Sequence, residues 1–181
     1  MGKNLSWAIL IPLGLCMIGC RQGYLDGSSA EAPTITATER VHVSLWIQQI
    51  GKPWLTNHGE LLSLKVKLTN TGTEKLESTG SNPVNLGEIL VNADGSVANH
   101  DYGRNKLPKK LEAGKTTTTV LSIPTQQFRG NSINIQAVQE GVAWLDGVGS
   151  NVLTLGPFTA CPVNGAMTLC DAQWQPLPSK N

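Results

Sequence analysis

Apolar and polar residues alternate with a period of two along several stretches of the chain, which is the pattern of half-buried β-strands. The clearest case is LLSLKVKLTNTG, residues 61–72, where Leu or Val takes every second position and Ser, Lys and Thr fall between. Its Asn-Thr-Gly ending predicts a turn. Residues 41–48, VHVSLWIQ, alternate in the same way and put Trp46 on the polar face of the strand.

Further strands and turns are predicted along the rest of the chain. Residues 84–96 predict a strand that runs into a hairpin turn at Asp94-Gly95. Residues 111–124 predict a turn at Gly114 and then a Thr-rich strand, and residues 131–139 and 151–158 supply two more strands. No long segment shows the 3.6-residue period of a helix. About seven short strands at this spacing predict an all-β fold, an immunoglobulin-like antiparallel β-sandwich.

The first residues read as a targeting signal. Lys3 precedes the apolar run WAILIPLGLCMIG, which has the length of a signal peptide and is too short to span a membrane. Residues 17–20, Met-Ile-Gly-Cys, resemble the lipobox of bacterial lipoproteins, whose cysteine receives a lipid before the signal is removed. We expect a lipoprotein signal peptide over 1–19 and lipidation of Cys20, which anchors the protein to a membrane. The alternative is a plain signal peptide with a chance cysteine.

The position of this anchor also predicts the domain organisation. Arg21 stands where inner-membrane lipoproteins usually have Asp, which favours a lipid anchor in the bacterial outer membrane. Residues 20–40 are rich in Ser, Thr, Ala and Gly and predict a flexible tether, followed by the sandwich over 41–160. For 161–181 we expect a disulfide-closed hairpin and tail.

The predicted disulfide joins Cys161 and Cys170. They are the two thiols that remain once the signal peptide and the lipidated cysteine are set aside. In an oxidising periplasm we expect them to pair. A redox role is disfavoured because the spacing is not CxxC.

Charge and motifs argue against nucleic-acid binding and catalysis. The net charge is +1, so no basic field exists to attract nucleic acid. The histidines are scattered, with His58 and His100 in apparent loops, and no third metal ligand accompanies His58 and Glu60. Neither a nucleophile-elbow pattern nor a phosphate-binding glycine loop occurs. We expect no enzyme activity, no metal and no cofactor.

Four phrases together resemble a known family. They are VKLTNTG, SNPVNLGEIL, GRNKLPKKLEAGKTTTTVLSI and INIQAVQEGVAWLDGVG, in that order over about residues 41–156. They resemble the immunoglobulin-like domain associated with bacterial surface-polysaccharide glycosyltransferases and methyltransferases. They are also similar to the glycan-recognition domain of O-antigen ABC transporters. The most specific element is residues 140–144, EGVAW, together with Arg104 and the segment that follows it. The resemblance implies an immunoglobulin-like fold and contact with a glycan.

Glycan sites on β-sandwiches need flat aromatic faces, with carboxylates, amides and arginines to bond hydroxyl groups. The candidate contacts are Trp46, Trp54 in a loop with Asn57, His58 and Glu60, and the set Arg104, Glu140 and Trp144. Trp144 has the alternative role of a core or rim tryptophan, and Glu140 that of a structural acceptor.

These observations predict a non-catalytic envelope lipoprotein that binds a surface or periplasmic glycan. The alternative is an accessory lipoprotein that contacts a protein partner in an envelope assembly, such as a secretion or export machine. Its contacts would be strand edges, loop ends or the tail with Trp174, which reads as an extended arm or a frayed end.

Overall fold

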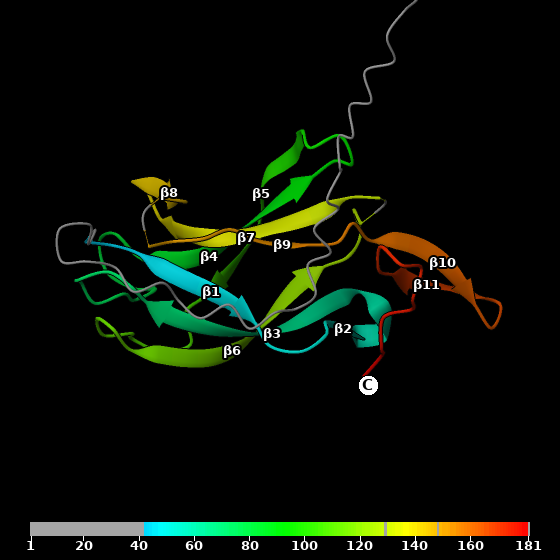
Figure 1. The fold of residues 1–181 in the computed structure, drawn as a ribbon, viewed down its shortest axis with the longest axis horizontal. Helices are drawn as coiled ribbons and strands as arrows, with labels where there is room; N and C mark the ends of the chain where they lie inside the picture. Colours follow the sequence, from blue (N-terminus) through cyan, green and yellow to red (C-terminus); the bar gives the residue numbers. More distant parts are fainter. Residues whose placement is uncertain (1–41, 129, 148, 181) are drawn as a thin grey trace, which may run out of the picture.

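The computed structural model describes residues 42–128, 130–147 and 149–180, which form two facing antiparallel β-sheets and a terminal hairpin (Figure 1). The predicted signal peptide, Cys20 and the tether lie outside the described residues. Among the described residues, no helix is long and apolar enough to cross a membrane.

The first sheet is built around β3 (Leu61–Asn70). Along one side of β3 runs β6 (Thr116–Pro124), which pairs with it from Leu61 to Thr69. The other side of β3 pairs with two short strands in succession, β1 (Leu45–Gln49) and β2 (Trp54–Thr56). β1 and β2 therefore act as two pieces of one edge strand.

The second sheet has the order β5-β4-β7, with β8 and β9 both paired to β7. The strands are β4 (Val84–Val91), β5 (Val97–Lys106), β7 (Ser132–Gln139), β8 (Ala143–Leu145) and β9 (Leu153–Leu155). The hairpin β10 (Thr159–Val163) and β11 (Ala166–Cys170) extends beyond one end of the sandwich (Figure 1).

The core lies between the two sheets, where the alternating apolar residues predicted from the sequence meet. Leu62, Leu64, Val66 and Leu68 of β3 are fully buried, and so are the inward residues of β4 and β7. The chain bends after β3, where Gly72 N donates to Asn70 Oδ1 at 3.0 Å, and the predicted turn at Asp94-Gly95 also forms. The immunoglobulin-like antiparallel β-sandwich is confirmed.

Several local predictions were wrong. Trp54 was placed in a loop but lies on β2, because the buried Leu55 beside it pairs with Leu62 of β3. His100 lies on β5, the return strand of the hairpin with β4. The described part of the chain has eleven short strands, more than the seven or so expected, because both outer edges are broken into pieces and the terminal hairpin adds two.

The C-terminal tail is neither an extended arm nor a frayed end. It runs parallel to β2: Leu55 N donates to Pro178 O at 2.7 Å, and Lys180 N donates to Leu55 O at 2.8 Å. Leu177 is buried, which holds the tail against the sandwich. Cys161 and Cys170, both buried, form the predicted disulfide across β10 and β11.

Candidate functional site

The predicted contact residues fall into three places. Arg104, Glu140 and Trp144 come together on the outer face of the second sheet. Trp46 and Trp54 lie on the outer face of the first sheet. The remaining three, Asn57, His58 and Glu60, surround the 3₁₀ turn η1 (Asn57–Gly59).

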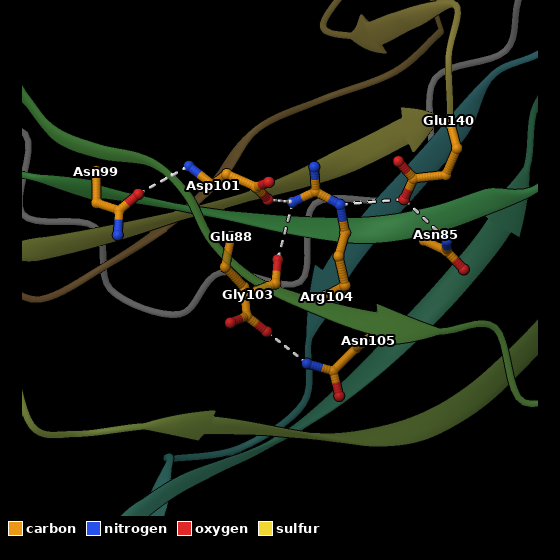
Figure 2. Close-up of polar contacts among 8 residues, drawn as sticks. All are labelled: Asn85, Glu88, Asn99, Asp101, Gly103, Arg104, Asn105 and Glu140. Atoms are coloured by element: carbon orange, nitrogen blue, oxygen red, sulfur yellow. Dashed lines mark hydrogen bonds and ion pairs between the residues drawn. The ribbon is translucent and has the colours of Figure 1, made fainter.

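The Arg104 cluster is an internally paired network (Figure 2). Arg104, on β5, donates from Nε to Glu140 Oε1 at 3.1 Å. Its Nη1 meets Asp101 Oδ1 at 2.5 Å and donates to the Gly103 carbonyl at 3.0 Å. Asn85 Nδ2, on β4, donates to the same Glu140 oxygen at 2.9 Å. The guanidinium is thus neutralised by two carboxylates of the chain itself.

Trp144 completes this cluster from β8. The Arg104 guanidinium carbon lies 4.5 Å from the centroid of its ring, and the His100 ring meets it edge-on with centroids 4.9 Å apart. The ring also sits above Gly87 of β4, where an added Cβ would come within 2.3 Å of a ring carbon. Trp144 therefore packs on the outer face of the sheet and ties β8 to β4 and β5.

Sequence reasoning missed the other members of this cluster, Asn85, Asp101, His100 and Gly87. The only local signal was Gly87, because a glycine inside a strand marks the close approach of another group. Since the charged groups already satisfy one another, the arrangement supports the structural roles foreseen as alternatives for Glu140 and Trp144.

Behind this cluster, a carboxyl group lies inside the sandwich. Glu88 pairs with Gly103 across β4 and β5, on the face opposite to Arg104, and is 1% exposed (Figure 2). Asn105 Nδ2 donates to its Oε1, while its buried Oε2 has no hydrogen-bond partner among the described residues. Burial raises the pKa of Glu88 to about 7, against the opposing effects of Asn105 and Arg104.

The two tryptophans of the first sheet share one face. Trp46 stands directly opposite Thr69 of β3, and Trp54 stands opposite Ser63. Residues 63, 65, 67 and 69 point outward, because the apolar residues 62, 64, 66 and 68 point into the core; of the outward set, Ser63 is nevertheless covered and only 3% exposed. The two β3 partners are six positions apart, so the indoles are separated along the sheet by about 20 Å.

The positions between the tryptophans are occupied by two lysines. Lys65 and Lys67 alternate outward on β3, and Lys67 faces Thr118 of β6. We call this set the tryptophan strip: Trp46, Trp54, Lys65, Lys67 and Thr118. Its indoles are half-buried. The Nζ atom of Lys180, in the C-terminal tail, lies 4.1 Å from the centroid of the Trp54 ring.

The η1 loop has a simpler arrangement. Asn57 Nδ2 donates to Glu60 Oε2. His58 is exposed and has φ of 54°, in the left-handed region. Across residues 42–128, 130–147 and 149–180, no group of three His, Cys, Asp or Glu side chains is placed to hold a metal ion.

No protein family and no curated protein matches this sequence. Among solved structures, a CARDB domain from Pyrococcus furiosus is similar at 18% identity and a TM-score of 0.38, over 62% of this chain and 91% of that one. A second structure of this CARDB domain, with di-metal ions, gives 16% identity and a TM-score of 0.38 over 70% and 94%. A Bacteroides uniformis β-glucuronidase gives 13% and 0.30 over 62% of this chain and 12% of that one.

Proposed function

We propose that this protein is a non-catalytic lipoprotein of the bacterial outer membrane whose sandwich binds a surface or periplasmic glycan through the tryptophan strip. The observation that carries the proposal is that Trp46 and Trp54 stand on one outer sheet face, about 20 Å apart along β3. Two separated indoles on one sheet face suit an extended polymer of several linked sugars.

The chemistry of the strip supports this ligand. Indole faces pack against the apolar CH groups of sugar rings, while the hydroxyls need hydrogen-bond partners nearby. Lys65, Lys67 and Thr118 supply donors, and Thr118 also supplies an acceptor, within the same face. The strip is built on paired strands, so its residues keep their spacing without a ligand.

The Arg104 cluster is a weaker candidate for the same role. Its guanidinium already pairs with Asp101 and Glu140, and its indole already contacts Arg104 and His100. A sugar there would have to replace bonds that hold β5, β4 and β8 together. The resemblance of residues 104–144 to glycan-associated domains supports the function. Among the described residues, the Trp54 ring of the strip has a ring contact only with the ammonium group of the exposed Lys180, and no ion pair between strands has to break for a sugar to approach.

Affinity electrophoresis tests the proposal. The chain from residue 20 onward, carrying Cys20→Ser, is run through gels that contain surface polysaccharide or peptidoglycan fragments from the source bacterium. We expect one fraction to retard it, and Trp46→Ala and Trp54→Ala to abolish the retardation. Trp174→Ala is the matched control, because that indole is 66% exposed but lies outside the strip.

The accessory-subunit alternative predicts the opposite outcome. If no fraction retards the protein, and crosslinking from the membrane-anchored form captures one envelope protein, the accessory-subunit alternative replaces glycan binding.

A further inference from the structure

We propose that the ligand of the tryptophan strip is an acidic glycan, a linear polymer with carboxylate or phosphate groups along its backbone. This inference rests on the proposed function and adds the charge of the ligand to it. It is carried by the two lysines that lie between the indoles on one face of the sheet.

Among the residues that the structure describes, Lys65 and Lys67 have no counter-ion. Of the carboxylates in the described residues, none lies within 4.0 Å of either ammonium group. Lys75 and Lys110 both pair with Glu77, whereas other exposed lysines, such as Lys52 and Lys106, have no ion pair among the described residues. What distinguishes Lys65 and Lys67 is their place between two indoles on one sheet face. Alternation places the two strip lysines about 7 Å apart along β3.

The surrounding face adds no negative charge. On β1 and β2 the outward residues beside Trp46 and Trp54 are neutral, and on β6 the outward residues are threonines, a valine and a serine. Lys180 brings a third ammonium group to the Trp54 end. The face thus combines aromatic surfaces with uncompensated positive charge.

An acidic sugar satisfies both features at once. Lysine binds carboxylate or phosphate as a point charge, without the fixed fork geometry of arginine, and so tolerates a repeating polymer that can shift along the face. A neutral glycan could accept hydrogen bonds from the two lysines, but it would leave their positive charges uncompensated. The positive charge is local, because the whole chain has a net charge of only +1, which distinguishes the strip from a broad nucleic-acid surface.

The test uses defined polymers and two variants. Binding of the Cys20→Ser chain is measured by isothermal calorimetry in 50 mM NaCl, with polygalacturonate, its carboxyl-reduced neutral form, poly(glycerol phosphate) and oligothymidylate as probes. The Lys65→Gln, Lys67→Gln double variant removes the charges of the strip. Lys106→Gln is the matched control. Lys106 is exposed and lies on β5 in the second sheet, where it stands opposite Asn85 of β4 and away from the strip.

We expect at least one of the two anionic polymers to bind, and the double variant to weaken that binding by roughly tenfold, as two surface charge contacts predict. Lys106→Gln should bind like wild type. The carboxyl-reduced neutral polymer should bind the wild-type protein no more tightly than polygalacturonate binds the double variant. Which anionic polymer binds more tightly distinguishes carboxylate from phosphate.

Three results would overturn the inference. Equal binding of polygalacturonate and its neutral form, still lost in Trp54→Ala, would leave glycan binding in place and remove its acidic character. If neither anionic polymer binds while an extracted polysaccharide still does, the acidic character of the ligand is refuted and glycan binding by the strip remains. Tighter binding of oligothymidylate than of any glycan would assign the strip to single-stranded nucleic acid.

Discussion

The buried carboxyl group of Glu88 makes a quantitative prediction about stability. Burial raises its pKa from the ordinary 4.5 to about 7, so the folded protein holds a proton that the unfolded chain has lost. Between these two values the unfolded chain binds fewer protons, and the free energy of unfolding therefore falls as pH rises. At about 1.4 kcal/mol per pH unit, the loss is about 3 kcal/mol and is complete a little above pH 7.

Glu88→Gln removes this dependence while keeping the shape of the side chain. Its amide oxygen can still accept from Asn105 Nδ2, but it cannot ionise. We expect the variant and wild type to differ little at pH 5, and the variant to be more stable by about 2–3 kcal/mol at pH 8. Glu112→Gln, at an exposed carboxylate, is the control and should follow the wild-type pH dependence.

Urea denaturation followed by tryptophan fluorescence at pH 5, 6, 7 and 8 measures these free energies. Groups that titrate equally in both proteins cancel in the difference between them. A difference between Glu88→Gln and wild type that stays constant from pH 5 to pH 8 would show that Glu88 is already ionised at pH 5. The reasoning from its burial would then be wrong.

Three further predictions concern the second sheet, the hairpin and the anchor. Gly87→Ala should lower the free energy of unfolding by about 1–3 kcal/mol, because the new methyl group overlaps the Trp144 ring; chemical denaturation measures this, and an unchanged midpoint would contradict the packing. Reducing Cys161–Cys170 should cost about 2–3 kcal/mol by releasing a short loop, and should lower the melting temperature without unfolding the sandwich at room temperature. Cys20→Ser should move the protein from the membrane fraction to the soluble periplasmic fraction; unchanged membrane association would refute the lipid anchor.

The strands that the sequence predicts well are those whose inward residues are all apolar. In β3, four buried apolar residues alternate with Ser, Lys and Thr on the outer face, so the local pattern alone identifies both the strand and its faces. β5 reads VANHDYGRNK and has no such alternation, because it lies at the edge of its sheet and most of its side chains are exposed or half-buried.

The site could be predicted only as a set of residue types. Arg104 and Glu140 are 36 positions apart and meet because β5, which carries Arg104, and β7, which Glu140 follows, both pair with β4. Trp46 and Trp54 share a face because β1 and β2 pair in succession with β3, and the segment between them has no pattern from which this register follows. The periodicity of one strand shows which of its faces is buried. Which residues of two strands lie opposite each other also depends on the turns and on the neighbouring strands, so one strand's pattern does not determine it.

The most direct test of glycan binding is a titration followed by the indole N–H signals in NMR spectra. The chain from residue 20 onward contains four tryptophans, Trp46, Trp54, Trp144 and Trp174, and hence four such signals. With the polysaccharide fraction that retards the protein, we predict saturable shifts of Trp46 and Trp54, while Trp144 and Trp174 stay in place. A shift of Trp144 with both strip signals unchanged would place the ligand on the second sheet, and no shift with any fraction would contradict glycan binding.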